Sequence, residues 1–243
     1  MEHSGTTLIS DLFRQVPGLD AGFEVGVMLA PDLRAFRTLD PYARNLPGGW
    51  GITEDEFDAC CAAPDLPGFY HRLRAASREL APDTRAIFDK TPRYISRLAH
   101  CLGQTPVPHV VAHKDPRGLL YSDWKRARVD DFAAWYDDYG PKKHRYVGQC
   151  YAAWAARAES PRVLSLGLEA LAFDARRSLD RLFAHVGLEF RLDYALMSGL
   201  RYRNTRANVV SADIALEYRR GFTPDQQALI ARDFAQFDRW FYE

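Results

Sequence analysis

Three short apolar runs recur along the chain, and each ends in a polar cluster that leads into a helical pattern. The runs are TRAIFDK (84–90), PHVVAHK (108–114) and RVLSLG (162–167). The helical patterns that follow them are RYISRLAHCLG, RGLLYSDWKRA and ARRSLDRLFAHVGL. A strand, a polar turn and a helix in repeated order are typical of a parallel sheet flanked by helices. The sequence therefore predicts an α/β fold that binds its ligand at the carboxyl ends of the strands.

The other segments are predicted from helical spacing and from turn residues. TTLISDLFRQV places apolar residues at helical spacing, and PGLDAG ends that helix. LPGFYHRLRAASREL has a second amphipathic helical pattern, whereas residues 31–66 are rich in Pro, Gly and Asp and are predicted to be loop with short helix. We predict a single domain over residues 1–243, with a helical insertion at 129–158 and a C-terminal cap loop and helix at 201–243.

The composition excludes several classes of protein. Of the 243 residues, 47% are hydrophobic and 26% are charged, and the 32 Lys and Arg balance the 32 Asp and Glu. Proteins that coat nucleic acids usually have a strong basic excess, so we expect no nucleic-acid partner and only a local anion site. No apolar run approaches the length of a membrane span, and no signal peptide precedes the first motif.

The cysteines indicate a reducing compartment. Their spacing fits no metal site, so we expect no metal, and the adjacent Cys60 and Cys61 are predicted to be thiols rather than a disulfide. A cytoplasmic location is therefore expected. The abundance of Arg and Ala relative to Lys indicates a GC-rich bacterial genome.

The opening segment MEHSGTTLIS contains a turn that suits phosphate binding. Gly5 allows close approach of a ligand to the backbone, and Thr6 and Thr7 begin a helix whose first N–H groups have no helical partner. The lysine of a nucleotide-hydrolysing P-loop is absent. Alone, Ser-Gly-Thr-Thr is weak evidence for a phosphate site, and an ordinary helix cap is the better reading of it.

Cationic clusters at the ends of the predicted strands favour the phosphate interpretation. Lys90 and Arg93 follow the first apolar run, and Lys114 and Asp115 follow the second. Ser122 comes eight positions after Lys114 (122 − 114 = 8), about two helical turns along the next helix. We expect these groups to meet at one sheet edge and to hold two phosphates of one nucleotide.

With these pieces in this order, the chain resembles sulfotransferases that use 3′-phosphoadenosine 5′-phosphosulfate. In that family an Arg/Lys/His-Ser-Gly-Thr-Thr loop holds the 5′-phosphosulfate, and His3 to Thr7 match it. An Arg-Asp-Pro-(five residues)-Ser segment holds the 3′-phosphate, and it is matched by KDP at 114–116 and by Ser122. DKTPRY at 89–94 is typical of carbohydrate and tyrosylprotein sulfotransferases. The resemblance extends from residue 3 to about residue 190.

The resemblance implies a fold, a reaction and roles for named residues. The fold would be the parallel sheet of P-loop nucleotide hydrolases, and the reaction would move a sulfuryl group to a hydroxyl or amine acceptor. The acceptor's proton would go to Glu24, and Asp20 is the fallback for this role. The alternative is that Glu24 is only a solvated carboxylate in a loop. The other expected roles are stabilisation of the transferred group by His3 and Lys90, and donor binding by Ser4, Gly5, Thr6, Thr7, Lys114, Ser122, Arg203 and Arg206.

The chain also departs from the family pattern. His3 replaces the commoner Arg or Lys, Lys114 replaces an Arg that would bind bidentately, and Leu168 stands where Tyr is common. The family has a central strand before the opening loop, and here only two residues precede His3. Either the true start lies upstream, which we favour, or the protein is divergent.

Two other functions remain open from the sequence. A nucleotide kinase or NTPase would share the fold class, although the loop lysine is missing. A degenerate, non-catalytic nucleotide-binding protein is consistent with the changes at His3 and Lys114. The acceptor (a glycan, lipid, small alcohol or peptide) and the oligomeric state do not follow from these motifs.

Overall fold

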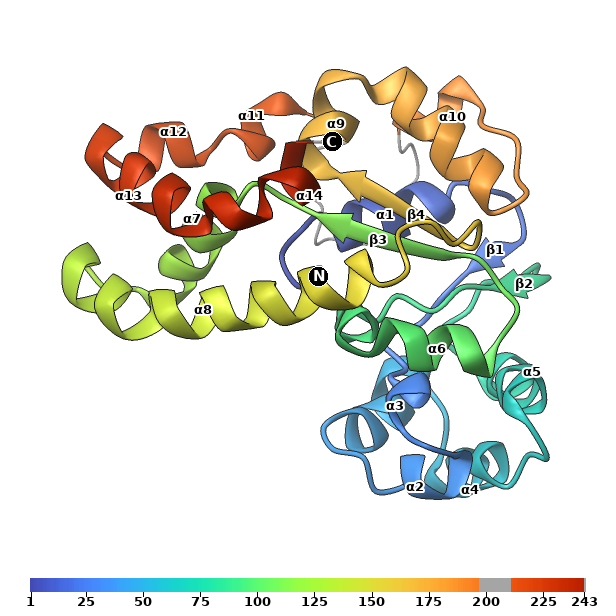
Figure 1. The fold of residues 1–243 in the computed structure, drawn as a ribbon. Coiled ribbons are helices and arrows are strands. Elements are labelled where there is room, and N and C mark those ends of the chain that lie inside the picture. Colours follow the sequence, from blue (N-terminus) through green and yellow to red (C-terminus); the bar gives the residue numbers. More distant parts are fainter. Residues whose placement is uncertain (197–210, 243) are drawn as a thin grey trace. The chain divides into compact units, whose positions relative to one another are not determined.

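The computed structural model describes residues 1–196 and 211–242, and its strands form two separate parallel pairs. The predicted parallel pairing is confirmed, but the strands of the described residues do not join into one sheet. Each pair belongs to a different compact unit (Figure 1). The first unit contains described residues 1–6, 108–191 and 211–242, and the second contains 7–107 and 192–196. The single domain over 1–243 stays a prediction.

The strand pair of the first unit is the one that the sequence predicts best. β3 (His109–His113) pairs in parallel with β4 (Val163–Gly167), with His113 opposite Gly167. Two helices connect them: α7 (Pro116–Ala127), which begins with Asp115 as N-cap, and α8 (Phe132–Ala155). The polar segments that follow β3 and β4 therefore lie at the same edge of this pair.

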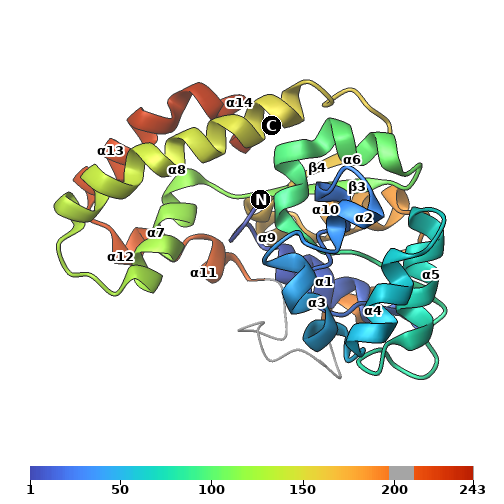
Figure 2. The same ribbon diagram turned by 90° about the horizontal axis from the view of Figure 1, so that it is seen from below.

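Aromatic side chains form the core around α8, which runs beside the C-terminal helices (Figure 2). Trp154 stacks on Trp240 with ring centroids 5.7 Å apart. The hydroxyl of Tyr136 donates to Asp233 at 3.0 Å. Helix α8 lies within the 129–158 segment, whose reading as an insertion stays a prediction, and its buried aromatic residues belong to the core. The other helices of this unit are α9 (Leu168–Phe173), α10 (Ala175–His185), α11 (Ala212–Ala215), α12 (Tyr218–Gly221), α13 (Pro224–Phe234), the 3₁₀ turn Ala235–Phe237 and α14 (Asp238–Tyr242).

The strand pair of the second unit is very short. β1 (Leu19–Asp20) pairs in parallel with β2 (Ala86–Ile87). PGLDAG, predicted to end the first helix, also contains β1, which the sequence did not predict because a two-residue strand has no recognisable alternation. Likewise, the strand predicted over 84–90 is reduced to β2, and α1 (Thr6–Phe13) ends before Val16.

The region 31–66 contains more helix than predicted. It holds α2 (Leu33–Phe36), α3 (Tyr42–Trp50) and α4 (Glu54–Cys61), followed by α5 (Leu66–Ala76). Burial of apolar side chains outweighs the breakers in α3, because Trp50 and Leu46 are fully buried although Pro47 lies inside the helix. The remaining elements of this unit are the 3₁₀ turns Val27–Leu29, Pro92–Arg97 and Leu192–Leu196, and α6 (Leu98–Gln104).

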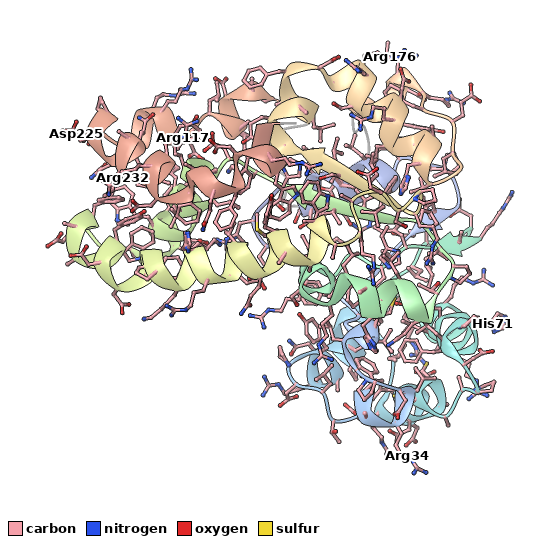
Figure 3. All side chains as sticks on the ribbon, viewed as in Figure 1. Arg34, His71, Arg117, Arg176, Asp225 and Arg232 are labelled. Carbon is pink, nitrogen blue, oxygen red and sulfur yellow. The ribbon has the colours of Figure 1, made fainter. Side chains whose placement is uncertain are left out.

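The surface of both units is charged. Arg34, His71 and Arg176 are exposed and point outward from their helices (Figure 3). All four cysteines are free thiols, as expected for Cys60 and Cys61. Among the described residues, no helix is both long enough and apolar enough to cross a membrane.

Candidate functional site

The opening loop lies at the carboxyl ends of β3 and β4. Ser4 is buried, and its hydroxyl donates to the carbonyl of Ala112, in β3, at 2.9 Å. Gly5 has φ +84°, and a Cβ there would lie 2.8 Å from the Leu168 side chain, directly after β4. Only glycine fits this backbone conformation and contact without strain. Among the described residues no strand precedes His3, and the Met1 ammonium donates to the same Ala112 carbonyl at 2.9 Å.

The loop leads directly into helix α1, which begins at Thr6. The backbone N–H groups in the first turn of a helix have no intrahelical acceptor, and the helix dipole adds positive potential there. Thr6 and Thr7 are both half-buried and add two hydroxyl groups to this turn. The arrangement suits an anionic group, as the sequence predicts for Gly5 to Thr7.

His3 is held by a network from α7 and α8 that the sequence did not reveal. Its Nδ1 lies 2.7 Å from Asp123, which also accepts from Lys143 at 2.7 Å and from Tyr139 at 3.1 Å. Burial alone would raise the pKa of Asp123, but the hydrogen bond from His3 and the charge of Lys143 outweigh it, so this pKa lies below its usual value. The second ring nitrogen of His3, Nε2, lies 2.7 Å from Arg126.

Lys114 and Ser122 meet as predicted from their spacing. Nζ of Lys114 donates to the Ser122 hydroxyl at 3.3 Å, and that hydroxyl donates to the Gly118 carbonyl at 2.9 Å. A Cβ at Gly118 would lie 2.5 Å from the Lys114 side chain, so the lysine packs directly over the first turns of α7. Lys114 is 5% exposed, and burial lowers its pKa.

A buried carboxyl from α9 lies beside this lysine. Glu169 accepts from the backbone N–H of Asp115 at 3.1 Å, and within the described chain its second oxygen is buried without a hydrogen-bonding partner. Burial raises the pKa of Glu169 to about 7, although the positive charge of Lys114 opposes the rise. Glu169 therefore fixes the backbone at the start of α7, next to Lys114.

The two catalytic residues predicted in the second unit form an ion pair. Nζ of Lys90 donates to Glu24 at 2.8 Å, and both side chains are 22% exposed. Lys90 also lies 5.5 Å from the centre of the Phe23 ring. The pair is reachable from solvent and joins one proton acceptor with one fixed cation.

A half-buried aspartate holds the two segments of this pair together. Asp89 accepts hydrogen bonds from the hydroxyls of Tyr70 at 2.6 Å and Thr91 at 2.7 Å, and from Tyr94. Thr91 in turn accepts from the backbone N–H of Gly26 at 3.1 Å. Burial raises the pKa of Asp89, against the lowering effect of these hydrogen bonds. Asp89 thus ties residues 24–26 to residues 89–94.

Several other predicted residues have structural roles or lie outside the described chain. Asp20 accepts from Arg14 and from the backbone N–H groups of residues 21 and 81, so the fallback base is a structural residue. His113, next to Lys114, packs 5.5 Å from Trp240, and burial lowers its pKa to about 3. The segment PKKHRY (141–146) lies inside α8.

Arg203 and Arg206 lie outside the described residues. Within the described part of the chain, no group of three or more His, Cys, Asp or Glu side chains could hold a metal ion.

Comparison with known proteins places this geometry in a known fold. No family model matches the sequence, and no curated protein matches it. The sulfotransferase domain of the Synechococcus PCC 7002 olefin synthase superposes with a TM-score of 0.59 and 18% identity, covering 96% of this chain and 91% of that one. The chain has the fold of a sulfotransferase domain. A second sulfotransferase domain, from the curacin biosynthetic pathway, superposes with a TM-score of 0.52 and 14% identity, covering 96% of this chain and 94% of that one.

The sulfotransferase fold confirms the resemblance found in the sequence, at the level of the fold. Two motifs that resemble the family, the opening loop and Lys114, lie at the carboxyl ends of β3 and β4. This edge is where a parallel sheet is expected to bind its ligand. The catalytic and binding roles of single residues are separate questions, because identities of 18% and 14% carry the fold alone.

Proposed function

We propose that this protein is a sulfotransferase that moves a sulfuryl group from 3′-phosphoadenosine 5′-phosphosulfate to a hydroxyl or amine acceptor. The observation that carries the proposal is the first unit's strand edge. There, the anchored Ser4 and Gly5 turn and the buried Lys114 with Ser122 occur together in a chain with the sulfotransferase fold. A buried cation next to a phosphate-type turn is costly unless it has an anion to bind.

In this proposal the opening loop and the residues that follow β3 hold the donor. The N–H groups and hydroxyls of Thr6 and Thr7 take the 5′-phosphosulfate, and Lys114 with Ser122 takes the 3′-phosphate. Lys114 offers a point charge rather than a bidentate fork, and desolvation strengthens its attraction for an anion. Arg203 and Arg206 are proposed to add cations to the nucleotide, as the sequence resemblance implies.

Glu24 is proposed as the proton acceptor. The acceptor's O–H (or N–H) bond breaks and its proton passes to Glu24, while a new bond forms from the acceptor atom to sulfur. The bond from sulfur to the 5′-phosphate oxygen breaks, and adenosine 3′,5′-bisphosphate leaves. Protonation of Glu24 weakens its ion pair with Lys90, which frees the ammonium for the sulfuryl oxygens.

One observation favours a second candidate, a nucleotide-binding protein without transferase activity. Both ring nitrogens of His3 already have protein partners, Asp123 and Arg126, so His3 is not available as the loop cation. Such a protein would bind the bisphosphate and transfer nothing. The kinase or NTPase alternative gains no support, since the loop offers no lysine for a γ-phosphate.

The test is transfer of labelled sulfate from the donor to molecules of a host extract, by wild type and by Glu24→Gln. Glutamine keeps a hydrogen bond from Lys90 but cannot take a proton. We expect transfer by wild type and a loss of about 10²–10⁴-fold in kcat for Glu24→Gln at saturating donor. Glu54→Gln, an exposed carboxyl on α4 in the same unit, is the matched control and should behave as wild type.

Each outcome decides between the candidates. Bisphosphate binding without labelled product supports the non-catalytic candidate. Equal transfer rates for wild type and Glu24→Gln would remove Glu24 from the reaction while leaving the donor site intact.

A further inference from the structure

An arginine from helix α7 contacts the opening loop. Arg126, near the end of α7, is exposed, and its NH1 donates to Nε2 of His3 at 2.7 Å. In the described part of the chain this is its hydrogen-bonding partner, and no carboxylate pairs with it. A guanidinium has five N–H donors, so most of the donors of Arg126 remain available.

The two contacts of His3 assign a role to each ring nitrogen. Arg126 can only donate, so Nε2 of His3 must accept and carries no proton. The proton therefore lies on Nδ1, which donates to Asp123 at 2.7 Å. Among the described residues no carboxylate pairs with Arg126, so nothing on this side of the ring balances its positive charge.

The orientation of His3 is fixed by side chains of α7 and α8. Asp123 is 8% exposed and is neutralised by Lys143, which is 5% exposed, so Asp123 does not balance Arg126. Tyr139 donates to the same carboxylate. His3 has φ +62°, a left-handed backbone conformation that is unusual for a residue other than glycine and places the ring in this network. The buried ion pair of Asp123 and Lys143 thus orients the His3 ring, and the ring orients the exposed guanidinium of Arg126.

We propose that Arg126 is the cation of the opening loop and binds the 5′-phosphosulfate end of the donor, with His3 as its positioning residue. The inference rests on the proposed function. It resolves the departure at His3, because the charge that Arg or Lys would bring at that position comes from α7 instead. The guanidinium also restores the bidentate geometry that suits phosphate and sulfate oxygens.

The test compares three nucleotides by calorimetry: adenosine 3′,5′-bisphosphate, adenosine 5′-monophosphate and adenosine 3′-monophosphate. Arg126→Ala should weaken binding of the two nucleotides that carry a 5′-phosphate by about tenfold and change the 3′-monophosphate by less than about twofold. Lys114→Ala should weaken binding of the two nucleotides that carry a 3′-phosphate and leave binding of the 5′-monophosphate nearly unchanged. Arg176→Ala, an exposed arginine paired with Asp180 on α10, controls for loss of one positive charge and should change nothing.

Substitution at His3 tests the positioning role. His3→Gln offers an amide oxygen that accepts from Arg126 and an amide N–H that donates to Asp123, whereas His3→Ala offers neither. We expect His3→Ala to weaken binding of the 5′-phosphate nucleotides and His3→Gln to recover most of it. Melting temperatures of all variants report whether the fold is kept.

The outcomes separate this inference from the proposed function. If Lys114→Ala loses the 3′-monophosphate while Arg126→Ala binds all three nucleotides like wild type, the donor site stands and the role of Arg126 is overturned. If folded wild type binds none of the three, the proposed function fails and this inference fails with it.

Discussion

Two aspartates, one in each unit, hold the proposed functional segments, and they do so by opposite electrostatics. Asp123 in the first unit is paired with the buried ammonium of Lys143 and with His3, and its pKa lies below the usual value. Asp89 in the second unit is surrounded by the hydroxyls of Tyr70, Tyr94 and Thr91, and burial raises its pKa.

The difference shows what a buried carboxylate requires. Hydroxyl groups can satisfy its hydrogen bonds, but only an opposite charge compensates for its lost hydration. Asp123 has such a charge and is bound into an ionic network, whereas Asp89 lacks a cation among the partners named above and acts mainly as a hydrogen-bond acceptor. Substitutions that remove only the charge should therefore affect the two very differently.

The largest effect is expected from Asp123→Asn. The substitution keeps the shape but leaves the ammonium of Lys143 buried without a countercharge. Removing one partner of a buried pair costs about 3–5 kcal/mol, so we expect a loss of this size in the free energy of unfolding, measured by denaturant titration.

The control for that experiment is a second substitution at the partner. Lys143→Met in the Asp123→Asn background removes the unpaired charge and should recover a large part of the lost free energy. A single Asp123→Asn variant as stable as wild type would contradict the ionic role given to this network.

A smaller, pH-dependent effect is expected at Asp11, a third aspartate, on α1. Burial raises its pKa to about 6, against the lowering effects of Arg14 and Lys90. A raised pKa stabilises the fold below the unfolded value of 3.8 and loses that contribution as the pH rises through about 6. Asp11→Asn should therefore gain about 1–3 kcal/mol relative to wild type between pH 4 and pH 8.

Thermal unfolding of both proteins across this pH range provides the measurement. A difference in stability that stays constant from pH 4 to pH 8 would show that Asp11 has an ordinary pKa, and Ser10→Ala, at the neighbouring buried position, controls for disturbance of α1.

The smallest effect is expected from Asp89→Asn. An amide oxygen still accepts from the tyrosine hydroxyls, and no cation among the named partners loses its countercharge. We expect the free energy of unfolding to change by less than about 1 kcal/mol. Because the pKa of Asp89 is raised, wild type loses stability relative to the variant as the pH rises. A loss as large as that of Asp123→Asn would erase the contrast between the two aspartates.

The sequence was sufficient for the parts of the site that depend on local spacing. Lys114 and Ser122 meet because a residue at a strand end faces the second turn of the following helix, and eight positions predict that geometry. The opening turn and the strands β3 and β4 also follow from short local patterns. Glu24 and Lys90 came from their order within the family resemblance; they form an ion pair, and their catalytic roles stay predictions.

The other parts of the site and of the fold depend on tertiary contacts, which short sequence patterns do not predict. Asp123 and Lys143 lie on different helices, 20 positions apart (143 − 123 = 20), and only tertiary packing brings them together. The same holds for Arg126 and His3. β1 has two residues and therefore no periodicity, and the Pro and Gly of α3 suggested a loop although its buried Trp50 stabilises a helix.

The central claim is that one doubly phosphorylated adenosine binds at the strand edge of the first unit. Its most direct test is a calorimetric titration of wild-type protein with adenosine 3′,5′-bisphosphate, next to a titration with ATP and Mg²⁺. The account predicts saturable binding of the bisphosphate, with a clear preference over ATP. Preference for ATP with Mg²⁺, or no heat from the bisphosphate with a fully folded protein, would contradict it.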